Sequence, residues 1–174
     1  MRTDRAGDAR SIVLTGFMGT GKNAVGLILA ERLGWPFVDT DALVEEKTGR
    51  TISAIFEQDG EAAFRRLERA ACQEVAARYE HVIATGGGAT LDPENRAALA
   101  GGNLLVCLTC EPEEIARRLA GDETRPLLAG DPVARIRELL AARQPVYEAL
   151  PHHVDTTHLS PEQVADEVLK LYAK

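Results

Sequence analysis

A glycine-rich segment near the N-terminus carries the most specific chemistry in this sequence. Residues 16–23 read Gly-Phe-Met-Gly-Thr-Gly-Lys-Asn, which fits the pattern G-x-x-x-x-G-K between an apolar run and an amphipathic run. Glycines let backbone N–H groups wrap around phosphate oxygens, and the N-terminus of a following helix adds positive potential. Lys22 would reach the β- and γ-phosphates. The segment predicts a nucleotide-binding P-loop, and the alternative interpretation is a glycine turn followed by a solvated lysine.

Asn23 is the position that departs from the P-loop pattern. Ser or Thr is expected there, because the hydroxyl group of either binds Mg²⁺. The amide oxygen of Asn is also a hard neutral ligand, but its side chain is longer, and Mg²⁺ demands near-ideal octahedral geometry. We expect Asn23 to retain phosphate binding and to weaken metal binding.

Two carboxylates and a glycine triplet follow other apolar runs. Asp39-Thr-Asp41 comes after residues 36–38. In extended backbone, alternate residues share one side, which would place both carboxylates together. One carboxylate would then hold Mg²⁺ or its water, and the other would accept a proton from an attacking hydroxyl. The alternative is that Asp41 caps a helix over 42–47. Gly86-Gly-Gly88 follows residues 81–85 and predicts a close backbone approach to a ligand, or a simple turn.

Three arginines are candidate ligands for an anionic substrate, because the planar guanidinium group matches carboxylates and phosphates. Arg65 follows Phe64, Arg125 lies in Thr-Arg-Pro-Leu-Leu, and Arg143 precedes Gln-Pro-Val-Tyr. A loop arginine that closes over a γ-phosphate would act as an arginine finger. Taken singly, each arginine is more often a solvated surface residue.

The cysteines and histidines do not form a convincing metal site. The chain has three cysteines, an odd number that argues against a disulfide framework. Cys107 and Cys110 form a C-x-x-C, but no second pair follows, and Cys107 lies in an apolar run typical of a buried strand. His152 and His153 are neighbours in a predicted strand, so their side chains point to opposite faces.

The apolar pattern predicts the elements that must position these residues. Strands are expected over 11–15, 36–38, 81–85, 104–108 and 152–155. Helices are expected over 22–33, 42–47, 62–79, a short stretch from 92, 111–119, 132–150 with an interruption at Pro145, and from the capping box at 160–163 onward. Strands that alternate with amphipathic helices predict an α/β fold with a mostly parallel sheet covered on both faces. Residues 1–10 are expected to form a loose tail, and residues 11–174 a single domain.

Composition narrows the function classes. The chain has 174 residues, 45% hydrophobic and 27% charged, with a net charge of −7. This charge argues against nonspecific binding to nucleic acid or to anionic membranes. No apolar run approaches the roughly 18 residues of a membrane span, and no secretory signal is evident. We therefore expect a cytoplasmic protein, and a monomer because no exposed apolar stripe is evident.

Together these segments resemble the shikimate kinase family, small P-loop kinases with the fold of nucleoside-monophosphate kinases. The resemblance spans nearly the whole chain from Ile12 onward. It rests on residues 16–22, Phe-Val-Asp-Thr-Asp at 37–41, Ile-Phe-Glu-Gln-Asp-Gly-Glu at 55–61, Phe-Arg-Arg-Leu-Glu at 64–68, Thr-Gly-Gly-Gly at 85–88, Thr-Arg-Pro-Leu-Leu at 124–128 and Arg-Gln-Pro-Val-Tyr at 143–147.

The resemblance implies ATP-dependent phosphorylation of the 3-hydroxyl of shikimate, in aromatic amino-acid biosynthesis, with Mg²⁺ as cofactor. It implies a three-layer α/β/α fold, a five-stranded parallel sheet in the order 2-3-1-4-5, a substrate-binding part near 39–67 and a mobile lid near 120–131. The implied catalytic residues are Lys22, Asp41 and Arg125. The implied ATP-binding residues are Gly16, Met18, Gly19, Thr20, Gly21, Lys22, Asn23, Ala24, Arg118 and Arg125, with Arg118 near the adenine. The implied shikimate-binding residues are Asp41, Arg65, Gly86, Gly87, Gly88 and Arg143, and the implied metal residues are Asn23 and Asp39.

Two other functions remain as alternatives. The first is a kinase for another small hydroxy acid of the gluconate type, which Asp41 and paired arginines would also suit. The second is a nucleotide-binding protein without catalysis, which only Asn23 favours. A panel of acceptors, and a test for ADP release that depends on shikimate, would separate these alternatives from the shikimate kinase hypothesis.

Overall fold

The computed structural model describes residues 11–121 and 130–174. Its strands are β1 (Ile12–Thr15), β2 (Phe37–Asp39), β3 (Val82–Ala84), β4 (Leu104–Thr109) and β5 (His152–Asp155). Its α-helices are α1 (Lys22–Leu33), α2 (Thr40–Thr48), α3 (Ile52–Asp59), α4 (Glu61–Ala76), α5 (Pro93–Ala100), α6 (Pro112–Leu119), α7 (Pro132–Glu148) and α8 (Pro161–Tyr172), and a short 3₁₀ helix, η1, spans Ala89–Leu91.

The strands form one sheet in the order β2-β3-β1-β4-β5 with every neighbouring pair parallel, as expected. In the central strands, Leu14 pairs with Ala84 on one side and with Val106 on the other. The carboxyl ends of β1, β2 and β3 therefore lie along one edge. Ligands bind outside this edge in open α/β sheets, so the segments that follow these strands are placed to form a site.

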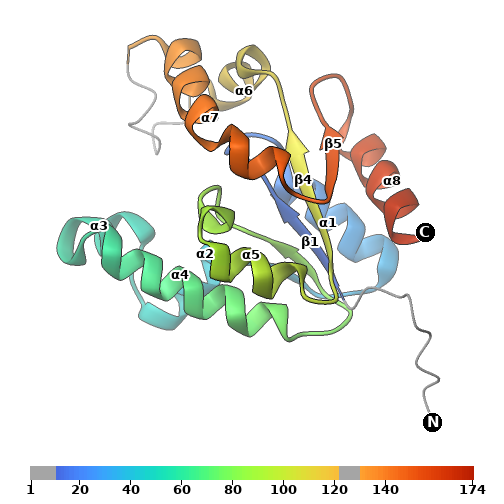
Figure 1. The fold of residues 1–174 in the computed structure, drawn as a ribbon, viewed down its shortest axis with the longest axis horizontal. Helices are drawn as coiled ribbons and strands as arrows, with labels where there is room; N and C mark the ends of the chain where they lie inside the picture. Colours follow the sequence, from blue (N-terminus) through green and yellow to red (C-terminus); the bar gives the residue numbers. More distant parts are fainter. Residues whose placement is uncertain (1–10, 122–129) are drawn as a thin grey trace.

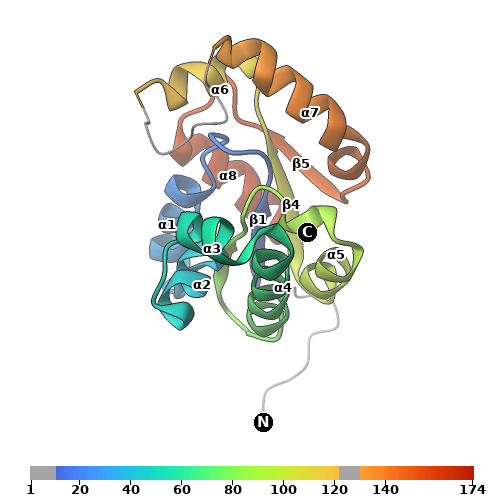
Figure 2. The same cartoon turned by 90° about the vertical axis from the view of Figure 1, so that its left-hand side faces the viewer.

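Helices cover both faces of the sheet, which gives the three layers that the resemblance implied (Figure 1 and Figure 2). Helices α1 and α8 lie together against one face, over a core that includes Ile12, Leu14 and Val106. Helices α4, α5 and α7 lie on the other face, over a core that includes Val13 and Leu105. Alternate residues of one strand enter opposite cores because strand side chains alternate between the faces. A smaller core lies between α2, α3 and α4.

Local sequence determines where several helices begin and where α1 ends. Ser160 and Gln163 form the predicted capping box at α8, and Asp92 caps α5 with Pro93 in its first turn. Gly34 ends α1 in the left-handed conformation that glycine adopts without strain.

Four element predictions need correction. Helix α2 starts at Thr40 rather than 42, because Asp39 caps it. Helix α3 forms over a segment in which the apolar pattern predicts no helix. Helix α4 ends at Ala76, so Tyr79 is not part of its buried stripe and is 58% exposed. Helix α7 continues through Pro145 instead of breaking there.

Within residues 11–121 and 130–174, no helix is both long enough and apolar enough to cross a membrane.

Candidate active site at the carboxyl edge of the sheet

The glycine-rich loop joins β1 to α1 as predicted. Gly16 has φ 131°, and a Cβ there would lie 2.2 Å from the carbonyl oxygen of Leu108, so only glycine fits. Gly21 precedes α1 without a side-chain cap. The first N–H groups of α1 therefore face the loop together with the positive end of the helix dipole. This arrangement suits an anion such as a phosphate group.

Lys22 lies over this loop in the described structure. Its Nζ donates hydrogen bonds to the carbonyl oxygens of Gly16 and Phe17, each at 2.8 Å. The ammonium charge is thus held at the mouth of the loop, where a bound phosphate would lie.

The other side chains of the loop differ in their exposure. Thr20 is buried, and its hydroxyl donates to the Phe17 carbonyl oxygen at 2.8 Å, so it stabilises the loop from inside. Asn23 and Ala24 are exposed in the first turn of α1, and Met18 is half-buried. A Cβ at Gly19 would meet Leu119 of α6 at 3.1 Å.

Asp39 and Asp41 lie together, but not because of an extended backbone. Asp39 ends β2, and its Oδ1 accepts hydrogen bonds from the backbone N–H groups of Asp41 at 2.8 Å and Ala42 at 3.1 Å. Asp39 is therefore the helix cap, and Asp41 lies in the first turn of α2. The alternation argument and the idea that Asp41 caps the helix are both wrong, although both carboxylates line the same cavity.

Asp41 has the environment of a proton acceptor. Burial, together with the negative charges of Asp39 and Glu68, raises the pKa of Asp41 to about 6. Its Oδ1 is buried and has no hydrogen-bond partner among the described residues. A carboxylate with this pKa is mostly ionised at neutral pH and can still hold a proton, which is what general-base chemistry requires.

Residues 86–88 bring the backbone against charged side chains from three helices. A Cβ at Gly86 would lie 2.7 Å from Oδ1 of Asp41, and one at Gly88 would lie 2.8 Å from Nη1 of Arg65. A Cβ at Gly87 would lie 3.5 Å from Nη1 of Arg143. The structure thus brings the Asp41 carboxylate, the predicted proton acceptor, and the guanidinium groups of Arg65 and Arg143 to one glycine loop.

Aromatic side chains hold the two guanidinium groups. Arg65 lies over the ring of Phe64 and Arg143 over the ring of Phe17, each with Cζ 5.3 Å from the ring centroid. Tyr147, one turn beyond Arg143, donates its hydroxyl to the carbonyl oxygen of Gly87 at 2.6 Å. Helix α7 is therefore tied to the glycine loop beside Arg143.

Glu68 is a site residue to which the sequence analysis gave no role. It is 2% exposed, and its Oε2 accepts from Nη1 of Arg65 at 2.8 Å. Burial raises its pKa above the ordinary value, while Arg65 opposes this shift. Its Oε1 would lie 3.2 Å from a Cβ at Gly86, so it also faces the glycine loop. The spacing Arg-x-x-Glu on a helix was the available sign, because residues three apart meet on one face.

Arg118 connects the P-loop to the segment after β5. Its guanidinium donates to the Gly19 carbonyl oxygen at 3.2 Å, to the Thr156 carbonyl oxygen at 2.7 Å and to Glu114 at 2.8 Å. This position beside the loop agrees with a residue near a bound nucleotide. Arg125 lies outside the described residues.

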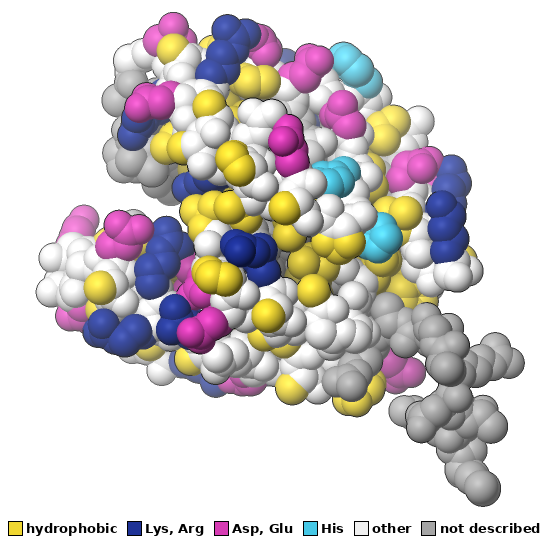
Figure 3. Space-filling view, in the orientation of Figure 1, with side chains coloured by type: hydrophobic (Ala, Val, Ile, Leu, Met, Phe, Trp, Pro, Cys, Tyr) yellow, Lys and Arg dark blue, Asp and Glu magenta, His cyan; other side chains and the backbone are white. Residues whose placement is uncertain are grey.

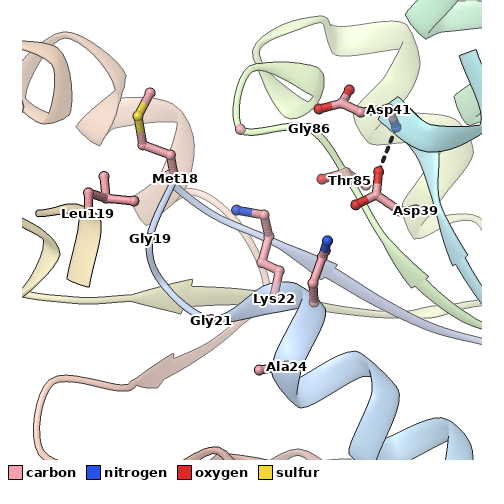
Figure 4. Close-up of a pocket in the computed structure, with 12 residues that line it drawn as sticks. Met18, Gly19, Gly21, Lys22, Ala24, Asp39, Asp41, Thr85, Gly86 and Leu119 are labelled. Atoms are coloured by element: carbon pink, nitrogen blue, oxygen red, sulfur yellow. Dashed lines mark hydrogen bonds between the residues drawn. The ribbon is translucent and has the colours of Figure 1, made fainter. Parts of the chain in front are cut away.

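A cavity of about 280 Å³ lies between the P-loop and the segments that follow β2 and β3; Arg65, Glu68, Arg118 and Arg143 are not among its lining residues. Figure 4 shows Lys22 with Met18 and Leu119 on one side, and Asp39 and Asp41 on the other. In the space-filling view the molecule is hollowed between α3 and the helices α6 and α7, with Lys or Arg side chains on both walls (Figure 3). The lining residues are Met18, Gly19, Gly21, Lys22, Asn23, Ala24, Asp39, Asp41, Thr85, Gly86, Gly87 and Leu119.

The donor set of the cavity fits a hard cation. The amide oxygen of Asn23 and the carboxylate oxygens of Asp39 and Asp41 are the oxygen ligands that Mg²⁺ takes in proteins. Cys107 is fully buried in β4, and burial raises its pKa to about 11, which makes it unsuited to redox or metal chemistry. Among the described residues, no three His, Cys, Asp or Glu side chains cluster as a metal site of their own.

Comparisons with known proteins agree with this geometry. The family model described as shikimate kinase matches residues 18–173. A shikimate kinase of Caldanaerobacter subterraneus subsp. tengcongensis is 45% identical, over 95% of this chain and 97% of its own. One of Symbiobacterium thermophilum is 48% identical, over 92% of this chain and 94% of its own. The structure of a shikimate kinase from Acinetobacter baumannii in complex with shikimate has a TM-score of 0.88 and 38% identity, covering 95% of this chain and 93% of that one.

Proposed function

The chain belongs to the shikimate kinase family, and we infer that the cavity at the carboxyl edge of its sheet is where it transfers the γ-phosphoryl group of ATP to the 3-hydroxyl of shikimate. This phosphorylation is a reaction of aromatic amino-acid biosynthesis. One observation carries the assignment of the site. The P-loop with Lys22, the acid Asp41 and the arginines Arg65 and Arg143 converge around residues 86–88.

The nucleotide side of the cavity is built to neutralise charge. The loop N–H groups and the N-terminus of α1 would hold the phosphates, and Lys22 would exchange its loop carbonyl partners for the β- and γ-phosphate oxygens. Arg118 would support the nucleotide through Gly19 and the segment after β5. Phosphoryl transfer has a loose transition state, so positioning and charge neutralisation matter more than a strong base.

The acceptor side of the cavity would position and deprotonate shikimate. Arg65 and Arg143 would bind the substrate carboxylate, and Glu68 would hold Arg65 in place. Asp41 would accept the proton of the 3-hydroxyl as its oxygen bonds to the γ-phosphorus and the bond to ADP breaks. The unpartnered Oδ1 of Asp41 supports this role, because a buried acceptor is stabilised by a donor from the substrate.

Mg²⁺ is the proposed cofactor. Asn23 and Asp39 would hold it, directly or through its waters. When bound, the ion would neutralise charge on the β- and γ-phosphates. The role of Arg125 and a lid over 120–131 remain predictions from the resemblance.

The test of this function is ADP release by the purified chain with ATP and MgCl₂, with and without shikimate. We expect turnover that depends on shikimate. Turnover with gluconate or another small hydroxy acid in its place would show that the acceptor was assigned wrongly, and ATP binding without turnover would favour a non-catalytic nucleotide-binding protein.

We also propose a monomer. Within the described residues, the exposed large apolar side chains are Leu27 in α1, Phe56 in α3 and Tyr79 in the segment between α4 and β3, so they belong to separate parts of the chain. Sedimentation at micromolar concentration should give a mass near 18.8 kDa. The cytoplasmic location remains a prediction from the sequence.

A further inference from the structure

Thr85 lies on the wall of the cavity, and the mechanism above gives it no role. It is 3% exposed, and its hydroxyl oxygen is fully buried without a hydrogen-bond partner among the described residues. Other threonines near the site are satisfied. The hydroxyl of Thr40 accepts from the Gly86 N–H at 3.2 Å, and that of Thr20 donates to Phe17. Since buried hydroxyl groups in native proteins are nearly always paired with protein or ordered water, and Thr85 lines the cavity, its hydroxyl is available to a water or ligand bound there.

The backbone fixes Thr85 between the two halves of the site. Its N–H donates to the Leu14 carbonyl oxygen at 3.0 Å, which ties it to the strand that carries the P-loop. The residue before it, Ala84, pairs in register with Asp39 on the other side. Figure 4 shows Thr85 beside Asp39 and Asp41, across the cavity from Lys22.

Two other residues that line the same cavity, Asp39 and Asn23, indicate what the Thr85 hydroxyl would meet there. Oδ1 of Asp39 already accepts two backbone N–H groups, and Asn23 brings an amide where a P-loop has a hydroxyl. Mg²⁺ dehydrates reluctantly and keeps several waters, each of which needs a hydrogen-bond acceptor. A hydroxyl that can both accept and donate meets this need.

We propose that Thr85 is a positioning residue for the metal ion that accompanies ATP, and that its hydroxyl accepts a hydrogen bond from water in the hydration shell of that ion. This inference rests on the proposed function, because it requires a metal–nucleotide complex in the cavity. A P-loop normally has a Ser or Thr hydroxyl at the position of Asn23. In this arrangement the Thr85 hydroxyl, just after β3, provides a hydroxyl group near the ion in its place.

The test measures how much MgCl₂ strengthens nucleotide binding, without any turnover. A non-hydrolysable ATP analogue is titrated calorimetrically into the full chain, with MgCl₂ and with EDTA, and the ratio of the two affinities is compared between variants. In Thr85→Val this ratio should fall about five-fold, the effect of one hydrogen bond, while affinity in EDTA stays unchanged. Thr85→Ser keeps the hydroxyl and should restore the ratio.

A second buried threonine provides the control. Thr90 bonds Thr15 at 3.3 Å and does not line the cavity. Thr90→Val should lower the melting temperature and leave the ratio unchanged. Thr85→Val should melt no earlier than the parent chain, because it removes a hydroxyl that has no partner in the ligand-free chain.

Three results would overturn the proposal. The ratio could stay at the parent value in Thr85→Val, or both affinities could fall together, which would indicate a purely structural role. In a parallel titration of Thr85→Val with shikimate, a fall in shikimate affinity alone would show that the hydroxyl faces the acceptor. If the analogue does not bind the parent chain at all, the proposed function itself fails and this inference fails with it, a result that differs from each of the other three.

Discussion

Asp41 is a residue at which catalysis and stability oppose each other. In the proposed function it accepts a proton from the substrate, yet its charged form is buried beside Asp39 and Glu68. We predict that Asp41→Asn lowers turnover by about 100-fold or more, because general-base catalysis contributes that much, while ATP binding is retained. Steady-state kinetics and calorimetry would measure the two effects, and near-full activity would exclude the assigned role.

The same substitution should stabilise the ligand-free chain at neutral pH. The pKa of Asp41 is about 6 in the folded chain against an ordinary 3.8. Between these values the folded chain keeps a proton that the unfolded chain has lost, so stability falls as pH rises through this window. Above pH 6 the charged Asp41 lowers the free energy of unfolding by its full amount, on the order of 2–3 kcal/mol. Asp41→Asn should therefore exceed the parent in free energy of unfolding at pH 7 and lose this advantage below pH 4, as urea titrations at both pH values would show.

Asn23 provides a prediction about metal dependence. Its longer amide side chain takes the place of a hydroxyl, and it lines the cavity with Asp39. Asn23→Ser should lower the MgCl₂ concentration for half-maximal activity several-fold, because a shorter ligand restores octahedral geometry. Asn23→Ala is the matched control and should raise that concentration. An unchanged metal titration in Asn23→Ser would show that position 23 does not contact the ion.

At the scale of the elements, glycines of the site should fall into two classes. At Gly16 a Cβ would strike the backbone oxygen of Leu108 at 2.2 Å and φ is positive, so Gly16→Ala should destabilise the fold itself. At Gly88 a Cβ would meet the end of the flexible Arg65 side chain at 2.8 Å, which can move. Gly88→Ala should therefore leave the melting temperature nearly unchanged and raise KM for shikimate about ten-fold through the displaced guanidinium. Equal losses of stability in both variants would contradict this division.

The elements also show what could be predicted from the sequence. The P-loop, the parallel sheet and α8 follow from local patterns, since strand periodicity, glycine spacing and the Ser160 capping box need no tertiary information. Helix α3 was missed because its eight residues are short for a periodic pattern, and its cap, Thr51, resembles ordinary loop chemistry. Glu68 was missed because its burial depends on the packing of α4 against the glycine loop, which no local pattern contains.

At the scale of the whole molecule, ATP and shikimate should each stabilise the same cooperatively folded domain by binding to different walls of the cavity. In the proposed function, the nucleotide binds the wall formed by the P-loop and α1, and shikimate binds the wall formed by α2, α4 and α7 around residues 86–88. A ligand at 100 times its Kd adds about 2.7 kcal/mol to the free energy of unfolding. For a chain of this size that corresponds to roughly 5–10 °C in melting temperature.

We therefore predict that a non-hydrolysable ATP analogue and shikimate each raise the melting temperature by this amount in a single transition. Arg65→Ala distinguishes the two walls, because Arg65 belongs to α4, lies beside Gly88 and donates its hydrogen bonds to Glu61 and Glu68. It should abolish the shift caused by shikimate and keep the shift caused by the analogue. Scanning calorimetry of both chains with each ligand would measure this. Loss of both shifts in Arg65→Ala would mean that this side chain holds the cavity together rather than binding the acceptor.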